Sequence, residues 1–477
     1  MWSVIVKKKN VWHQKKPSSN SHDIQLPQCF RSARELAFFL LEEFRIREQF
    51  VSDSLQRWDR RIELSSQDRR LAMEISIGVI RRQLTLDTLI EHQLTRPREK
   101  LEPSLWTLLQ IGVYQLVMLD QIPDHAAVSE TVELAAKLKR VRWKKMVNAI
   151  LRSISRQLIE DVATAPKANA IPLSFERYRC FASDYFDDPE SNISRYVSKA
   201  FSFPESLISD WITRYGIDQT LQIAQWFNQR NKLYLRVNLL KTNRDFLLTE
   251  LLDSGIQASL GTELQSIRLD QAVPLESLVG FDSGKFTIQD ESAIAAGNLL
   301  NPQPGETVLD LCAAPGTKTT HLAELMQNQG TIIATDVGED RLDKIKQNTS
   351  RLGLNIVQPR LIKLHETDLP GAPFDAILVD APCSNSGVLG KRPEARWRID
   401  NSSINELVEI QRHLVRLALD HLKPRGRLVY STCSFDPREN GELLKRVLKD
   451  YPGRAIVQEN IHLPGSPSDG GYQGLVC

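Results

Sequence analysis

The chain has 477 residues, with 61 Lys and Arg against 59 Asp and Glu and a formal net charge of +2. A typical domain takes roughly 100 to 200 residues, so this length excludes a peptide module and indicates several domains. The small net charge excludes recruitment of a nucleic acid by global charge, and such a partner would have to meet local basic clusters.

Cysteine and histidine usage argues against a disulfide or metal scaffold. The six cysteines are sparse, unevenly spaced and without a CxxC pair, so we expect thiols of a cytoplasmic protein. His321, His365 and His413 lack metal-ligand spacing, and we expect no metal. The longest apolar run, Leu105 to Leu119, is interrupted by two glutamines, which predicts a core helix and no membrane span.

The N-terminal half is predicted to be mainly helical. Residues 1–29 carry five lysines and little periodicity, the composition of a basic flexible arm. From Ser32 apolar residues recur at i, i+3, i+4 and i+7, which predicts a compact all-helical domain over residues 30–158. Residues 159–228 are expected to be a linker and a helical segment, because Asp161 to Pro172 is rich in Ala, Pro and Asn without a core period.

The C-terminal half is predicted to be α/β. Alternating apolar residues from Leu233 to Leu239, then a helical stretch, predict a small α/β subdomain over residues 229–290. Residues 291–477 alternate short apolar runs with helices, which predicts a parallel sheet wound on both faces. The strand candidates are Thr307–Leu311, Thr331–Thr335, Phe374–Val379 and Gly426–Ser431.

The first chemical motif is a buried strand that runs into a turn of small residues and then a helix. The turn is Cys312, Ala313, Ala314, Pro315, Gly316, Thr317 and Lys318. Small residues let a ligand touch the backbone, and Asp336, after the next strand, could accept the hydroxyls of a ribose. The alternative is that the turn only packs the helix against the sheet and binds no ligand. The absence of GxGxxG spacing and of a Walker lysine favours S-adenosylmethionine over a dinucleotide or ATP.

Two cysteines follow predicted strands of the same sheet. Cys383 stands in Asp380-Ala-Pro-Cys-Ser and Cys433 in Ser431-Thr-Cys-Ser. Ligands of open α/β sheets bind at the carboxyl ends of the strands, so the two thiols and Asp380 are expected to share a cleft. The alternative is that each cysteine is a small core residue.

These motifs, with Arg236-Val-Asn and Gln289-Asp-Glu-Ser upstream, resemble the RsmB/Nop/Sun family of RNA cytosine-C5 methyltransferases over nearly the whole chain. Asp124-His-Ala-Ala-Val and Met146-Val-Asn-Ala-Ile-Leu-Arg resemble the NusB-like domain of its bacterial small-subunit ribosomal RNA members. The resemblance implies a multidomain fold with an all-α NusB-like RNA-binding domain. A small α/β, RRM-like subdomain and a C-terminal α/β Rossmann-like methyltransferase domain follow it.

The resemblance also implies roles for individual residues. The turn from Cys312 to Lys318 would hold the methionine end of S-adenosylmethionine, Asp336 its ribose and Asp368 its adenine side. Asp380 would meet the cofactor and the target base. Cys433 would be the nucleophile and Cys383 would assist release, with small-subunit ribosomal RNA as the substrate.

Three departures from the family pattern stand out in the sequence. Thr317 replaces a second glycine, Pro437-Arg-Glu-Asn replaces Pro-Glu-Glu-Asn, and Gly470 to Cys477 lacks an aromatic, basic last strand. We expect the first two to be tolerated and the third to disturb the sheet edge.

Two clusters of basic residues in the sequence are candidates for RNA contact. Residues 137–145 hold six positive charges, and residues 391–398 follow the Asp380 motif; both are expected to contact RNA.

The alternatives to a ribosomal RNA methyltransferase are a non-enzymatic RNA-binding or ribosome assembly factor and an enzyme acting on another RNA such as tRNA. A further alternative is a DNA cytosine methyltransferase with Cys383 as nucleophile, against which Thr432-Cys433 argues.

Overall fold

The computed structural model describes residues 26–229, 232–271, 273, 277–363, 368–465 and 468–477. The chain divides into two compact units. One contains the described residues from Leu26 to Gln229 together with the short segment Arg392–Arg398, and the other contains the described residues from Lys232 to Lys391 and from Ile399 to Cys477. Residues 1–25 of the expected basic arm, and His365, lie outside the described residues.

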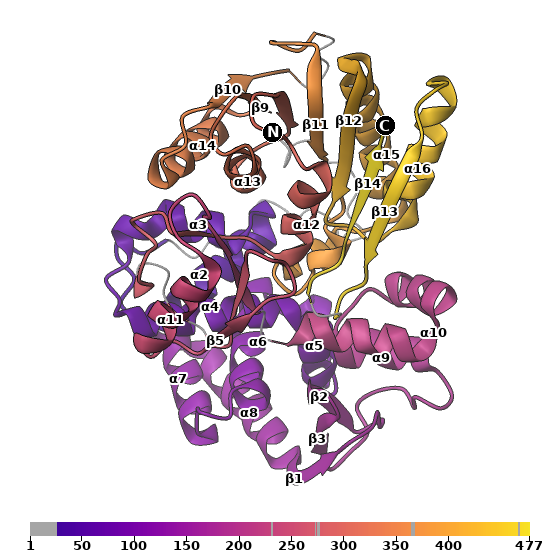
Figure 1. Cartoon of the computed structure of the whole chain (residues 1–477). Helices are drawn as coiled ribbons and strands as arrows, with labels where there is room; N and C mark the ends of the chain where they lie inside the picture. Colours follow the sequence, from indigo (N-terminus) through magenta and orange to yellow (C-terminus); the bar gives the residue numbers. More distant parts are fainter. Residues whose placement is uncertain (1–25, 230–231, 272, 274–276, 364–367, 466–467) are drawn as a thin grey trace. The chain divides into compact units, whose positions relative to one another are not determined.

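The N-terminal unit starts with a helical bundle, as the apolar periodicity predicts (Figure 1). Its helices are α2 (Ala33–Arg47), α3 (Val51–Trp58), α4 (Ser66–Arg81), α5 (Gln83–Glu91), α6 (Pro103–Met118), α7 (Asp124–Lys137) and α8 (Lys144–Gln157). Short 3-10 turns are η1 (Asp59–Arg61), η2 (Arg98–Lys100) and η3 (Val141–Trp143). The predicted core helix is α6, which is buried along most of its length and packs against α2, α4, α5, α7 and α8. No helix within the described ranges has both the length and the apolarity to cross a bilayer.

The predicted linker after the bundle is wrong. Strands β1 (Leu158–Ala163), β2 (Ala170–Ser174) and β3 (Arg177–Phe181) form an antiparallel sheet of order β1-β3-β2. Pro172 is tolerated because β2 is an edge strand, where a missing N–H costs no ladder bond. The strands are too short to show a clear period. Helices α9 (Ile193–Phe201) and α10 (Glu205–Asn228) follow, as a helical segment was expected to.

The second unit contains the small α/β subdomain. Strands β4 (Leu233–Val237), β5 (Ala258–Leu260), β6 (Ser266–Leu269) and β7 (Phe286–Ile288) form an antiparallel sheet of order β5-β6-β4-β7. Helix α11 (Arg244–Asp253) covers it, because Leu247 and Leu251 pack against Leu235 and Ile267 in one core. The alternation from Leu233 therefore predicted its first strand correctly.

The rest of this unit is built on a seven-stranded sheet. Its order is β10 (Val357–Leu361), β9 (Thr331–Asp336), β8 (Thr307–Leu311), β11 (Phe374–Asp380), β12 (Leu422–Thr432), β14 (Gly471–Val476) and β13 (Ile456–His462). The first five strands are parallel, and β14 runs antiparallel to both of its neighbours, β12 and β13, so the predicted parallel sheet has one reversed strand.

Helices cover both faces of this sheet, as Figure 1 shows. Alternate residues of β11 point to opposite faces. Ala376 and Leu378 pack in the core formed with α12 (Glu291–Leu300), α13 (Thr317–Leu325) and α14 (Glu339–Leu352). Ile377 and Val379 pack with α15 (Asn401–Asp420) and α16 (Gly441–Val447). The 3-10 turns of this C-terminal region are η5 (Ser386–Val388), η6 (Pro393–Trp397), η7 (Pro437–Glu439) and η8 (Leu448–Asp450).

The expected disturbance at the end of the sheet is wrong. Gly471–Val476 forms β14, which pairs with both β12 and β13. Tyr472 and Val476 are fully buried and join the core below α16. The side chains of Tyr472 and Val476 therefore pack this strand into the core, although the strand lacks the further aromatic residues of the family pattern.

Candidate active site

The strand order creates a switch point between β8 and β11. The chain proceeds from β8 to β9 and β10 on one side, whereas β11 and β12 lie on the other side. Ligands of such sheets bind at the carboxyl ends of the strands beside this point. Cys312 comes directly after β8, Cys383 after β11 and Cys433 after β12. The predicted site residues therefore meet at one edge of the sheet.

The turn after β8 has the backbone that a close ligand contact needs. Cys312 (φ 68°) and Gly316 (φ 98°) are both left-handed, and a Cβ on Gly316 would lie 3.2 Å from Cα of Ile345. Thr317 is the first residue of α13, where ordinary helical backbone accepts any side chain. The replacement of the second glycine is therefore tolerated. Unpaired N–H groups at this helix start can bind a carboxylate.

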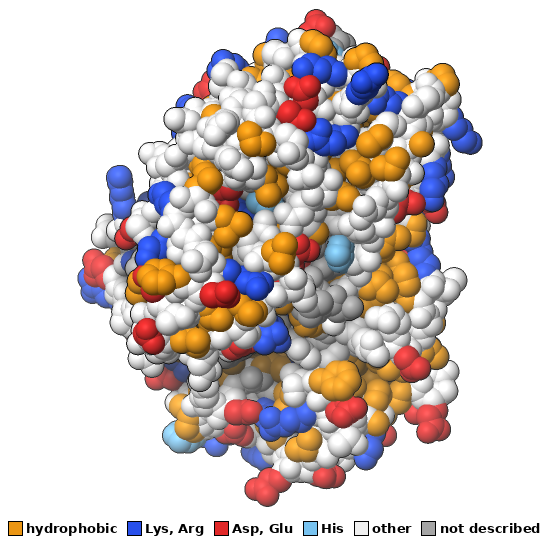
Figure 2. Space-filling model, in the orientation of Figure 1, with side chains coloured by type: hydrophobic (Ala, Val, Ile, Leu, Met, Phe, Trp, Pro, Cys, Tyr) orange, Lys and Arg blue, Asp and Glu red, His pale blue; other side chains and the backbone are white. Residues whose placement is uncertain are grey.

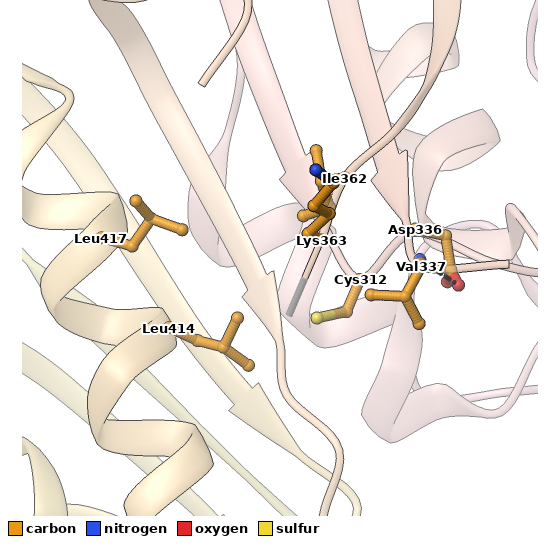
Figure 3. Close-up of a pocket in the computed structure, with 7 residues that line it drawn as sticks. All are labelled: Cys312, Asp336, Val337, Ile362, Lys363, Leu414 and Leu417. Carbon is orange, nitrogen blue, oxygen red and sulfur yellow. Dashed lines mark hydrogen bonds between the residues drawn. The ribbon is translucent and has the colours of Figure 1, made fainter. Parts of the chain in front are cut away.

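A pocket lies beside this turn, where polar and apolar walls face each other (Figure 3). Leu414 and Leu417 project from α15 toward the residues at the strand ends. The lining residues are Cys312, Asp336, Val337, Ile362, Lys363, Leu414 and Leu417. An adenosine requires an acid that accepts hydrogen bonds from its ribose hydroxyls and, beside it, aliphatic side chains that contact its base. This pocket provides both.

Asp336 is held rigidly at the end of β9. Its carboxylate is 3% exposed and accepts hydrogen bonds from the backbone N–H groups of Ala314 (3.2 Å) and Val337 (2.8 Å). The guanidinium of Arg341 lies 3.1 Å away. These contacts fix the carboxylate beside the turn, and a carboxylate has lone pairs to spare for a ribose.

Asp380 and Lys318 form an ion pair between β11 and α13. Lys318 Nζ lies 2.8 Å from Asp380 Oδ2. Burial is the largest single effect and lowers the pKa of Lys318. The charge and hydrogen bond of Asp380, with the charges of Cys433 and Asp310, together outweigh it, so the net shift is upward. A permanent cation therefore stands at the strand end that carries Asp380 and close to Cys433.

The two thiols predicted to share a cleft are in contact. Cys383 Sγ and Cys433 Sγ lie 3.2 Å apart, because Asp380 pairs with Ser431 in the parallel β11–β12 ladder. The contact with Cys433 raises the pKa of Cys383 well above its ordinary value, and burial and the charge of Glu439 add to the shift. Cys383 therefore holds its proton at neutral pH.

A second acid, Asp310, is buried under the site. Asp310 Oδ2 accepts a hydrogen bond from Thr319 Oγ1 at 2.6 Å, which ties β8 to α13. Burial raises the pKa of Asp310 to about 7; the Thr319 hydroxyl opposes the shift, and the Asp380 carboxylate adds to it. The loop that follows Asp310 is thus anchored at both ends.

Comparisons with known proteins identify the family. Residues 297–469 match the family described as 16S rRNA methyltransferase RsmB/F, and residues 31–156 match the NusB family. The chain is 37% identical over 429 residues to a probable ribosomal RNA small subunit methyltransferase B of Synechocystis sp., covering 88% of this chain and 90% of the relative. The chain belongs to the RsmB family of 16S rRNA methyltransferases.

Further comparisons cover the middle of the chain and its whole length. Residues 203–276 match the ferredoxin-like domain of RsmF/B-like methyltransferases. A probable ribosomal RNA small subunit methyltransferase B of Bacillus subtilis is 32% identical over 397 residues, covering 82% of each chain. The crystal structure of PH0851 has the same fold, with a TM-score of 0.74 and 24% identity over 94% of this chain and 100% of that one.

RsmB family membership gives the chain its reaction. It transfers a methyl group from S-adenosylmethionine to C5 of a cytosine in 16S ribosomal RNA. The described residues fit the cofactor, since the pocket at Asp336 suits an adenosine and the start of α13 suits a carboxylate. The expected NusB-like domain, small α/β subdomain and Rossmann-like methyltransferase domain are confirmed, and the subdomain matches a ferredoxin-like family.

Not every expected RsmB residue lies in the pocket. Asp368 is exposed, next to residues 364–367 outside the described chain, and its adenine contact stays a prediction. Arg438, at the departure in Pro437-Arg-Glu-Asn, points to Asp436, with its Nη2 2.6 Å from the carboxylate. It is therefore accommodated without disturbing the fold.

The expectation that residues 391–398 form an RNA-binding basic surface is wrong for Arg396. Lys391 is paired with Asp290 and Asp469, each at 2.7 Å. Arg396 is fully buried within the helical unit, with its guanidinium 4.0 Å above the ring of Phe203. Its hydrogen-bond acceptors are the carbonyl oxygens of Arg81, Ser202 and Phe227 and the side chain of Asn228. A charge run alone cannot distinguish a solvated face from such a buried anchor.

Sequence reasoning also missed several residues of the site. Arg341 orients Asp336, Leu414 and Leu417 line the pocket, and Glu439 contacts the loops of both cysteines. Glu439 had a weak signal, since it stands six residues after Cys433 in a family motif. The leucines of α15 lie on an ordinary amphipathic helix, and their sequence carries no mark of the pocket.

Proposed function

We propose that methyl transfer proceeds through a covalent adduct of Cys433, that Cys383 assists release of the product, and that Asp380 contacts the target base. The observation that carries this proposal is the 3.2 Å contact between the two thiols beside the Lys318–Asp380 ion pair. Two nucleophilic groups, one cation and one acid meet at the strand ends where an α/β sheet binds its ligands.

The chemistry requires a nucleophile because C5 of cytosine is poorly nucleophilic. Addition of the Cys433 thiolate to C6 makes C5 an enamine carbon, which takes the methyl group from the sulfonium of S-adenosylmethionine. The addition is easier when N3 is protonated or hydrogen-bonded, because charge develops on that nitrogen, and a carboxyl group beside the ring, here Asp380, suits that role. A base then removes the C5 proton, the C6–sulfur bond breaks and Cys433 leaves as a thiolate.

The electrostatics of the pair support this division of roles. Lys318 is a cation near Cys433 and stabilises a thiolate there. Cys383 has a raised pKa and keeps its proton. A protonated thiol in contact with Cys433 can exchange a proton with the leaving sulfur.

The target cytosine must leave its stack to reach the thiols, so we propose a loop or an extruded nucleotide as the substrate conformation. Phosphate contacts are proposed for the exposed basic residues of the NusB-like domain, Lys137, Lys139, Arg142 and Lys145. In Figure 2 the basic and acidic side chains of the visible face are interspersed, which favours a local cluster over a broad basic field. The cytoplasm is the proposed compartment, because the six cysteines are sparse in the sequence and form no CxxC pair.

The adduct is tested on a denaturing gel with 16S ribosomal RNA and S-adenosylmethionine. Cys433→Ala should abolish methylation and give no retarded band, whereas Cys383→Ala should accumulate a covalent protein–RNA species. Cys477→Ala, at an exposed cysteine, is the matched control and should behave as wild type. A retarded band from Cys433→Ala but not from Cys383→Ala would reverse the two roles, and no band from either would reject the adduct.

A further inference from the structure

Glu439 is a buried carboxylate between the loops of the two cysteines. It ends the turn η7, six residues after Cys433, and its side chain has no exposed surface. All four of its hydrogen-bond donors are uncharged groups. They are the backbone N–H (2.9 Å) and hydroxyl (2.6 Å) of Ser384, the hydroxyl of Ser434 (2.6 Å) and the side-chain amide of Gln411 (3.0 Å).

The two serines are the immediate neighbours of the two thiols. Ser384 follows Cys383 and Ser434 follows Cys433, so one carboxylate binds both loops. The turn itself is fixed to β12, because the Tyr430 hydroxyl donates to the carbonyl of Glu439 at 2.6 Å. One side chain thus joins the two loops, in addition to the β11–β12 ladder and the contacts of Asn385 with Cys433 and of Ser386 with Ser434.

Glu439 also gives the thiol pair an uneven electrostatic environment. Burial raises the pKa of Glu439 itself, and the hydroxyl and amide donors oppose this shift by stabilising the anion. The negative charge of Glu439 raises the pKa of Cys383. Lys318 places its positive charge near Cys433. The anion therefore favours the protonated form of Cys383, and the cation favours the thiolate of Cys433.

We propose that Glu439 is a positioning residue that holds the loops of Cys383 and Cys433 together and keeps the proton of the pair on the sulfur of Cys383. This inference rests on the roles proposed above for the two cysteines. It adds to them a side chain that contributes to the difference between the two thiols, beside their mutual contact and burial.

Substitution of Glu439 leaves the other ionisable groups around the two thiols unchanged. The described ones are Lys318 on α13, Asp310 on β8, Asp380 on β11, Tyr430 on β12 and Tyr472 on β14. Burial and nearby charges raise the pKa of Tyr430 well above its ordinary value, so it stays neutral in the range where thiols titrate. Changes in thiol titration on removal of Glu439 can then be assigned to Glu439.

The test measures alkylation of each cysteine by iodoacetamide across a pH series, using the full chain without RNA and peptide mass spectrometry. In wild type Cys433 should react at lower pH than Cys383. In Glu439→Gln the Cys383 profile should move down by about 1 pH unit, the effect of removing one nearby charge. Glu442→Gln, at an exposed acid on α16, removes the same charge outside the site and should match wild type.

A folded Glu439→Gln with the wild-type Cys383 profile would overturn the inference. If Glu439→Gln does not fold, Ser434→Ala decides, because it keeps the charge of Glu439 and removes the hydrogen bond that Ser434 donates to it, together with the contacts of Ser434 with Ser386 and Asp436. Its kcat should fall at least several-fold with KM unchanged, and a wild-type kcat would also overturn the inference. The assignment of Cys433 as the nucleophile is tested separately. If Cys433→Ala still formed the covalent adduct with RNA, that assignment would be wrong.

Discussion

Lys318 Nζ donates a hydrogen bond to Asp380 Oδ2 over 2.8 Å and so joins the helix after the cofactor turn to the strand end before Cys383. The pair links three parts of the proposed reaction: the turn that suits the cofactor carboxylate, the acid proposed to contact the base and the thiol proposed to attack it. Lys318 is also the cation near Cys433, an activator that spacing alone did not assign.

Removal of this cation should slow adduct formation. Lys318→Met keeps the length of the side chain but leaves the Cys433 thiolate unsupported, so the rate of covalent adduct formation at neutral pH should fall about 10- to 100-fold. The rate should recover in part at higher pH, where more thiolate forms. Rapid-quench measurement of the adduct across pH checks this, and a pH-independent decrease would assign Lys318 to substrate positioning instead.

Asp336 should contribute directly to cofactor affinity. Asp336→Ala removes a charge-assisted contact to the ribose, worth about 1.5–3 kcal/mol, and should weaken S-adenosylmethionine binding roughly 10- to 100-fold. Titration calorimetry measures this. Glu339→Gln, at an exposed acid a few residues along the chain, is the control and should bind normally. Unchanged affinity in Asp336→Ala would remove the ribose assignment.

The sheet and the cysteine site could be predicted because their signals are local. Thr307–Leu311 and Phe374–Val379 are apolar runs with buried residues on both faces, and the cysteines follow parallel strands directly. Strand β10 was missed, since it is an edge strand with Pro359 and mostly exposed side chains. Neither periodicity nor composition distinguishes such an edge strand from a loop.

Residues that act through distant partners could not be predicted. Glu439 meets Ser384 across 55 positions and Gln411 across 28, and no local pattern relates these three residues. Arg396 lies in a basic run, yet its partners come from helices far earlier in the chain. Tertiary contacts alone decide whether such a charge is solvated or enclosed.

Arg396 should therefore matter for folding. Arg396→Met leaves several buried carbonyl oxygens of the helical unit without donors, at a cost of about 3 kcal/mol or more. Thermal melting of the purified chain should show a clear drop in Tm, whereas Arg60→Met at an exposed arginine should leave Tm unchanged. If Arg396→Met instead kept its Tm and bound RNA more weakly, the residue would act as a phosphate contact.

The exposed lysines of the NusB-like domain should set part of the salt dependence of RNA binding. Substitution of Lys137, Lys139 and Lys145 by Gln should weaken binding and lower the slope of log affinity against log salt. The slope should fall by about 0.7 to 0.9 for each phosphate that the variant no longer neutralises. Lys445→Gln with Lys449→Gln, two exposed lysines near α16, is the control. Equal slopes for both sets would exclude residues 137–145 from the RNA interface.

Asp310 should make folding stability depend on pH. Its folded pKa is about 7 against an ordinary 3.8, so between these values the folded chain binds a proton that the unfolded chain has released. Stability from this group therefore falls as pH rises through that window, by up to about 4 kcal/mol at roughly 1.36 kcal/mol per pKa unit. Asp310→Asn keeps an acceptor for Thr319 and carries no charge, so its Tm relative to wild type should climb from pH 4 to pH 7. Asp343→Asn, at an exposed acid, should run parallel to wild type, and a parallel curve for Asp310→Asn would mean that Asp310 is ionised in the folded protein throughout.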